Sequence, residues 1–137
     1  MKTHNLFISH SWDYSDEYEN LVRLLRDRPY FRFNDYSVPR YDPIHYASND
    51  RELKNAIRQK MQPCGVIVIL AGVYATYSRW INIEIDLAKG GFGSPKPIIA
   101  VVRRGAERTS QRVTSAADRI VRWNADSVVR AIREVAP

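Results

Sequence analysis

The chain has 137 residues, of which 45% are hydrophobic and 26% are charged. This length fits one domain with its own core, and this composition excludes a disordered or collagen-like chain. The first four residues lead into a strand-like segment without the apolar run that export requires, and the longest apolar stretch, residues 65–73, is far shorter than the roughly 20 residues of a membrane helix. We therefore expect a single domain that is neither exported nor membrane-bound.

Cysteine and histidine give no sign of a disulfide or a metal site. Cys64 is the single cysteine, so no internal disulfide can form. His4, His10 and His45 do not have the spacing of metal ligands. We expect a cytoplasmic protein without a bound metal.

Positive charge is concentrated near the carboxyl terminus. The net charge is +6, and residues 101–137 contain eight arginines against four acidic residues. A zinc-finger spacing, an RNP-type aromatic motif or a sustained basic helix would indicate nucleic-acid binding, and the sequence contains none of them. We expect a solvated basic face and no nucleic-acid partner, although such a face also suits a phosphate-bearing small ligand.

Strand and helix signals alternate along the first part of the chain. An apolar strand begins at residues 6–8, and a helix follows with Ser15 as its predicted N-cap and Pro29 as its stop. Residues 31–38 alternate aromatic and polar side chains, as a half-exposed edge strand does. Residues 39–48 have two prolines, two tyrosines and no periodicity, which predicts a long loop of the kind that carries function.

The middle of the chain predicts two helices around a buried strand. Asn49 and Glu52 resemble a capping box at the start of a helix that ends before Pro63. Residues 66–70 are apolar on both faces, as in a central parallel strand. A further helix is predicted over residues 78–89, where glycines end it.

The last part of the chain predicts two more strands. Residues 97–102 are apolar throughout, whereas residues 119–123 have the mixed pattern of a second edge strand. Between them, residues 103–118 predict a loop with at most one short helix. Asn124 is the expected cap of the final helix.

This alternation of strands and helices predicts an α/β fold in which helices cover both faces of a five-stranded parallel sheet. The flavodoxin-like order 2-1-3-4-5 places the two polar-marked strands at the edges, so we predict a three-layer sandwich with that order. Ligands of such sheets bind beyond the carboxyl ends of the strands where the order reverses, here between the first and third strands. The site should therefore lie near residues 9–12 and near residues 71–74 with the following helix.

Tyr77, Trp80 and Glu84 have the spacing i, i+3 and i+7, which places them on one face of the helix beside this predicted site. A carboxylate between aromatic walls suits the cleavage of a ribosyl bond, because the sugar gains positive charge in the transition state. The alternatives are a surface glutamate for Glu84 and ordinary packing against the sheet for Trp80.

Other polar residues near the strand ends allow weaker interpretations. Asp35 and Ser37 either form a turn or order a ribose and its loop. His10 lies between Ser9 and Ser11, but the G-x-S-x-G elbow of a hydrolase is absent. A Walker motif and G-x-G-x-x-G are also absent, so NAD would not be held as in a dehydrogenase.

Three segments resemble TIR domains. Residues 6–11 are similar to the opening TIR box, and Ser78 and Trp80 precede Glu84 by six and four residues, as in the TIR motif that carries the catalytic glutamate. Residues 35–38, followed by a proline-containing loop and the helix from Asn49, resemble the TIR-like family that includes the Thoeris antiphage proteins. The resemblance extends over nearly the whole chain.

The resemblance implies cleavage of NAD with release of nicotinamide and formation of a cyclic ADP-ribose-type signal. NAD would be the substrate, and no other cofactor is implied. Glu84 would be catalytic and would contact the ribose hydroxyls. Together with the predicted strand-end site, this gives a set of substrate-binding candidates: Ser9, His10, Ser11, Trp12, Asp35, Ser37, Tyr77 and Trp80. Expected partners are further copies of the chain, in a dimer or filament, and an effector protein reached through the nucleotide signal.

Two other functions stay open. Many TIR domains are non-enzymatic interaction modules, and the loop at residues 39–48 would then dock onto another TIR surface. A nucleoside deoxyribosyltransferase-like enzyme also uses a glutamate on a similar sheet. A phosphate-accepting receiver domain ranks last, because the acidic pair and the lysine of that class are absent.

Overall fold

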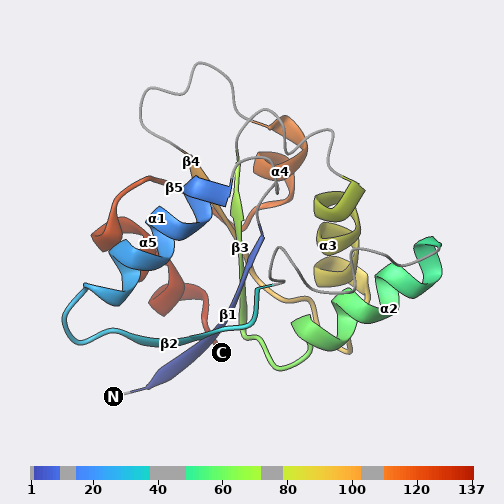
Figure 1. Ribbon diagram of the computed structural model, residues 1–137, viewed down its shortest axis with the longest axis horizontal. Helices are drawn as coiled ribbons and strands as arrows, with labels where there is room; N and C mark the ends of the chain where they lie inside the picture. Colours follow the sequence, from blue (N-terminus) through green and yellow to red (C-terminus); the bar gives the residue numbers. More distant parts are fainter. Residues whose placement is uncertain (1, 10–14, 38–48, 72–78, 103–109) are drawn as a thin grey trace.

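A computed structural model describes residues 2–9, 15–37, 49–71, 79–102 and 110–137 of the chain. Strands and helices alternate strictly along these ranges (Figure 1). In chain order they are β1 (Thr3–Ser9), α1 (Ser15–Arg26), β2 (Arg32–Asp35), α2 (Asp50–Met61), β3 (Val66–Leu70), α3 (Arg79–Gly90), β4 (Ile98–Val102), α4 (Gln111–Ala116), β5 (Arg119–Arg122) and α5 (Ala125–Val135).

The strands form one sheet in the order β2-β1-β3-β4-β5, and every neighbouring pair is parallel. The predicted fold class and strand order are therefore confirmed. In the register of β1 and β3, Ser9 lies opposite Ile69, so the carboxyl ends of these two strands lie next to each other. This is the switch point, because the chain proceeds from β1 to β2 on one side and to β3 on the other.

Helices cover both faces of the sheet, with α1 and α5 on one face and α2, α3 and α4 on the other (Figure 1). Side chains alternate between the two cores, because successive residues of a strand point to opposite faces. In β3, for example, Ile67 and Ile69 face α2 and α3, whereas Val66 and Val68 face α1 and α5. The all-apolar sequence of this strand thus reflects burial on both sides.

Asparagine caps begin two of the helices, as the sequence predicts. Asn49 Oδ1 accepts a hydrogen bond of 2.9 Å from the backbone N–H of Glu52, which caps α2. Asn124 Oδ1 accepts one of 3.1 Å from the backbone N–H of Ser127, which caps α5. Each cap satisfies a backbone donor that has no partner within the helix.

Two predicted boundaries need correction. The strand expected at residues 31–38 is limited to β2, because beyond Asp35 the Ser37 hydroxyl group accepts the hydrogen bond of the Ile8 N–H. Ser15 lies inside the first turn of α1 rather than at its N-cap. Residues 111–116 form α4, the one short helix allowed in the predicted loop, and Ser110 is its N-cap.

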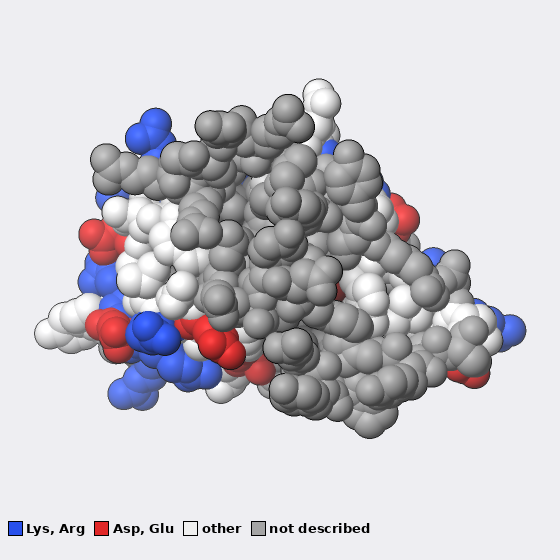
Figure 2. Space-filling model, turned by 45° about the horizontal axis from the view of Figure 1, so that its top comes forward, with Lys and Arg blue, Asp and Glu red and all other residues white. Residues whose placement is uncertain are grey.

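Basic and acidic side chains are intermixed over the described part of the face shown in Figure 2.

None of the described helices combines the length and the apolar character needed to cross a membrane. The predicted loop at residues 39–48 lies outside the described ranges.

Candidate functional site

A buried hydrogen bond joins β1 to α3 at the switch point. Ser9 is the last residue of β1, and its hydroxyl group donates to Glu84 Oε2 in the second turn of α3. Ser9 is 2% exposed and Glu84 is 4% exposed. The structure thus brings together two of the predicted site residues, and the alternative interpretation of Glu84 as a surface glutamate is wrong.

Burial changes the chemistry of the Glu84 carboxyl group. Loss of solvation raises its pKa to about 8, although the hydrogen bond from Ser9 opposes part of this rise by stabilising the charged form. At neutral pH the protonated form therefore predominates. A carboxyl group whose pKa is moved close to neutrality by its surroundings is typical of functional sites.

Trp80 lies one turn before Glu84 on α3 and is half-buried. Its ring packs against the core formed by α2, α3 and α4. This contact agrees with the packing interpretation of Trp80. Its role as a wall of a substrate pocket stays a prediction.

Asp35 and Ser37 form a polar junction at the end of β2. Asp35 Oδ1 accepts hydrogen bonds from the Ser37 backbone N–H, at 2.9 Å, and from the Ser37 hydroxyl group. Asp35 Oδ2 accepts a hydrogen bond from the Tyr18 hydroxyl group. The Ser37 hydroxyl oxygen in turn accepts a hydrogen bond of 3.1 Å from the Ile8 backbone N–H.

This junction reaches β1 one residue before Ser9. Because Ile8 and Ser9 are adjacent, the Asp35 junction beside β2 and the Glu84 hydrogen bond from α3 both fix the carboxyl end of β1. Asp35 and Ser37 therefore order the strand end, and the bond from the Ser37 N–H to Asp35 Oδ1 agrees with the turn-forming interpretation. Their role towards a ribose stays a prediction. Four further predicted substrate-binding residues, His10, Ser11, Trp12 and Tyr77, lie outside the described ranges.

Within the described ranges, no group of three or more His, Cys, Asp or Glu side chains is placed to hold a metal ion. Among the residues that the structure describes, the hydrogen-bond partner of Glu84 is Ser9 rather than a second carboxylate. The arrangement is thus suited to a single carboxyl group acting on a ligand at the carboxyl ends of β1 and β3.

A family model described as "Thoeris protein ThsB, TIR-like domain" matches residues 7–108, well over half of the chain. The chain belongs to this family. It is accordingly a TIR-type module of Thoeris antiphage defence. A comparison with curated protein sequences found no match.

The TIR-like match begins in β1 and includes Ser9, Asp35, Ser37 and Glu84, so the described site lies within it. The region from α4 to α5 lies beyond the matched residues.

One contributor at the end of β2 was missed by sequence reasoning. Tyr18 was not among the predicted site residues, but its hydroxyl group bonds to Asp35. Burial of the ring and the neighbouring Asp35 raise the pKa of Tyr18 above its usual value, so it remains a neutral donor. A half-buried tyrosine generally needs a hydrogen-bond partner for its hydroxyl group, and this requirement was the available signal.

Ser110 and Arg112 were also missed, because they lie in the segment predicted as a loop. Ser110 is completely buried, and its backbone N–H donates to the Ala71 carbonyl oxygen, at 3.0 Å, just after β3. Arg112 donates to Asn82 and to Asp86, each at 3.0 Å, and so links α4 to α3. These contacts hold the helix that carries Glu84.

Proposed function

We propose that the chain cleaves NAD between the ribose and nicotinamide, with Glu84 as the catalytic carboxyl group. The buried hydrogen bond between Ser9 and Glu84, at the carboxyl ends of β1 and β3, is the observation that supports this function most strongly. Parallel sheets of this order bind ligands at that position. Membership of the TIR-like family adds support, because the glutamate lies within the matched residues.

The reaction requires little acid catalysis. When the bond between ribose C1′ and the nicotinamide nitrogen breaks, its electron pair neutralises the positive charge of the nicotinamide. Positive charge develops on the ribose, and a nearby carboxylate stabilises it. Water then attacks C1′ to give ADP-ribose and a proton, or the purine of the same molecule attacks to give a cyclic product.

The raised pKa of Glu84 fits this scheme. The resting carboxyl group is mainly protonated at neutral pH, so the buried site holds no uncompensated charge. A cationic nicotinamide ring beside it favours the carboxylate and lowers its pKa. Substrate binding would thus produce the charged form that the transition state requires.

Access to Glu84 must change before chemistry can occur. A carboxyl group that is 4% exposed contacts a substrate only after its neighbours rearrange. We propose that assembly with further copies of the chain, or another trigger in the cell, supplies this rearrangement. The product would then act as a nucleotide signal for an effector protein.

The same burial favours one other candidate, a non-enzymatic TIR interaction module. A protonated glutamate that is hydrogen-bonded to Ser9 can serve simply to join α3 to β1. In that case Glu84 would matter for stability and the chain would act through its surfaces.

The test is chromatography of the products after incubation of the concentrated protein with NAD at pH 8. The enzyme should release nicotinamide, and Glu84→Gln should lower the release by about a hundredfold or more, because the neutral amide cannot stabilise the developing charge. Glu19→Gln, an exposed carboxylate on α1, is the matched control and should keep full activity.

The products separate the candidate functions. ADP-ribose indicates hydrolysis, and a cyclic isomer indicates cyclisation. Exchange of bases between nucleosides without NAD cleavage would instead support a deoxyribosyltransferase. Self-association without turnover, under conditions where Glu84→Gln assembles equally well, would support the interaction module.

A further inference from the structure

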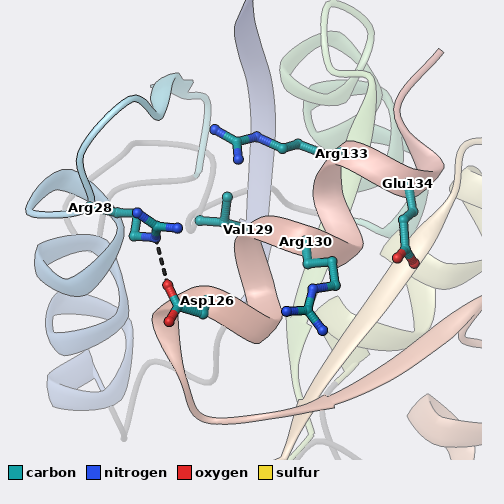
Figure 3. Close-up of a pocket in the computed structure, with 6 residues that line it drawn as sticks. All are labelled: Arg28, Asp126, Val129, Arg130, Arg133 and Glu134. Carbon is teal, nitrogen blue, oxygen red and sulfur yellow. Dashed lines mark ion pairs between the residues drawn. The ribbon is translucent and has the colours of Figure 1, made fainter.

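Two hollows adjoin each other beside α5, away from Glu84. The larger, of about 370 Å³, lies between the end of α1 and α5 and is shown in Figure 3. The smaller, of about 310 Å³, lies at the start of β1 and is lined by Lys2, His4 and Tyr30 among others. Arg133 lines both, so we describe them together as the α5 groove. Its end at His4 is separated from Ser9 by five residues of extended strand, roughly 17 Å.

Basic side chains dominate the α5 groove. Arg28, Arg130 and Arg133 line its larger part, and Figure 3 shows the side chains of Arg28 and Arg133 approaching each other near Val129. Two carboxylates also line it, but each has a basic partner. Asp126 Oδ1 lies 2.7 Å from Arg28 Nε, and Glu134 Oε2 lies 3.6 Å from Nε of Arg119.

These pairings leave Arg130 and Arg133 without a carboxylate partner in the portion of the chain that the structure describes. Arg130 is exposed on α5. Two guanidinium groups are thus available to an anion, and guanidinium groups bind phosphate through paired hydrogen bonds.

One of these guanidinium groups is already held in place. Arg133 Nη2 donates a hydrogen bond of 2.7 Å to the Tyr30 carbonyl oxygen, and its Cζ lies 5.8 Å from the centre of the Phe31 ring. A side chain fixed before binding loses less conformational freedom when a ligand arrives.

Tyr30 is an unusual residue at the same position. Its φ angle is +61°, in the left-handed region that residues other than glycine rarely adopt, and its side chain is 79% exposed. The hydrogen bond from Arg133 holds this turn. The turn thus presents an aromatic ring to solvent beside Arg133.

His4 lies in the smaller hollow, close to two positive side chains. Burial lowers the pKa of His4, and the positive charges of Lys2 and Arg133 lower it further. The ring stacks on Phe31, with 5.5 Å between the ring centres. Two positive side chains, Lys2 and Arg133, thus line the hollow, and its histidine is neutral at physiological pH.

We propose that the α5 groove is a second binding site, distinct from the Glu84 site, for a phosphate-bearing nucleotide. The phosphates would bind to Arg130 and Arg133, and the base would stack on the ring of Tyr30. The volume of each hollow is close to the lower limit for known small-molecule sites, so the two hollows together are large enough for a nucleotide. Arg130 and Arg133 lie beyond residues 7–108, so these two arginines are not part of the family match, whereas Tyr30 lies within it.

The test is calorimetric titration of the full chain with ADP, adenosine and inorganic phosphate. ADP should bind at least about tenfold more tightly than either of its parts, because both the base and the phosphates are held. The titrations are made on Glu84→Gln, so that turnover and the charge of the other site do not contribute.

Three variants locate the binding. Arg130→Gln should weaken ADP binding about tenfold through loss of a charged hydrogen bond, whereas Arg51→Gln, a matched exposed arginine on α2, should not. Tyr30→Asn keeps a residue that tolerates the left-handed turn but removes the ring. It should weaken ADP binding while leaving the binding of inorganic phosphate unchanged.

Several results would overturn the proposal. Equal binding of ADP and inorganic phosphate would mean a general anion site, and equal losses in Arg130→Gln and Arg51→Gln would mean attraction by net charge alone. An absence of ADP binding by folded Glu84→Gln protein, in which the α5 groove is unchanged, would refute it directly.

Discussion

Glu84 is the residue whose carboxyl group affects both the stability of the fold and the proposed chemistry. It is buried, and it receives a hydrogen bond from Ser9 at the end of β1. Its pKa is raised from 4.5 to about 8, so its charged form is disfavoured by the fold. The fold thus tolerates this residue best when it is protonated, while the reaction requires the carboxylate.

This conflict predicts how stability varies with pH. Below about pH 4.5 Glu84 is protonated whether the chain is folded or unfolded. Between pH 4.5 and about 8 the unfolded chain releases the proton and the folded chain keeps it, so the free energy of unfolding falls as the pH rises. Glu84→Gln cannot ionise and should be more stable than the wild type by roughly 3 to 5 kcal/mol at pH 9.

The measurement is denaturant unfolding of both proteins at pH 5, 7 and 9. The other titrating groups are the same in both, so the difference between the two curves isolates Glu84. The two proteins should be nearly equal at pH 5 and should diverge steadily towards pH 9. A constant difference over this range would contradict the raised pKa.

Ser9 should set the pH at which Glu84 ionises. Ser9→Ala removes a hydrogen bond that favours the carboxylate, so the pKa of Glu84 should rise further. In the proposed reaction kcat/KM should increase with pH up to about 8 in the wild type and up to a higher pH in Ser9→Ala. Ser9→Thr keeps the hydroxyl group and should retain the original profile. Identical profiles for all three proteins would show that Ser9 does not act through Glu84.

At the scale of elements, the caps of the helices can be tested separately from the site. Asn124→Ala removes the acceptor of the Ser127 N–H at the start of α5 and should cost about 1 kcal/mol of stability. Asn124→Asp keeps an acceptor and should remain close to the wild type. Thermal unfolding distinguishes them, and equal stability of all three proteins would mean that the cap contributes nothing.

Elements were predictable from the sequence where one local signal decided them. The caps at Asn49 and Asn124 and the apolar strand β3 are of this kind. The end of β2 was not predictable, because it depends on a contact between Ser37 and Ile8, which are 29 residues apart. The short helix α4 was only weakly indicated, since its cap Ser110 is fixed by burial and by a bond to Ala71.

In the candidate site, too, local sequence signals predicted some features, and contacts between distant residues determine the others. Helical spacing and strand order predicted that Glu84 lies near the end of β1. Neither could predict its burial or its bond to Ser9, which depend on the packing of α3 against the sheet. The bond between Tyr18 and Asp35 was missed for the same reason.

At the scale of the whole molecule, the sheet predicts a gradient of stability from its centre to its edge. β3 is buried along its whole length and pairs with β1 and β4. β5 pairs with β4 and is mostly exposed. Hydrogen exchange should therefore be slowest at the amides of β3 and faster at those of β5. Equal protection of both strands would contradict this view of the fold.

The central claim is that Glu84, at the switch point of the sheet, cleaves NAD. Release of nicotinamide by the wild type and by Glu84→Gln, measured side by side at pH 8 on folded protein, tests it most directly. The account predicts release by the wild type and a loss of about a hundredfold or more in the variant. Equal release by the two proteins would contradict it.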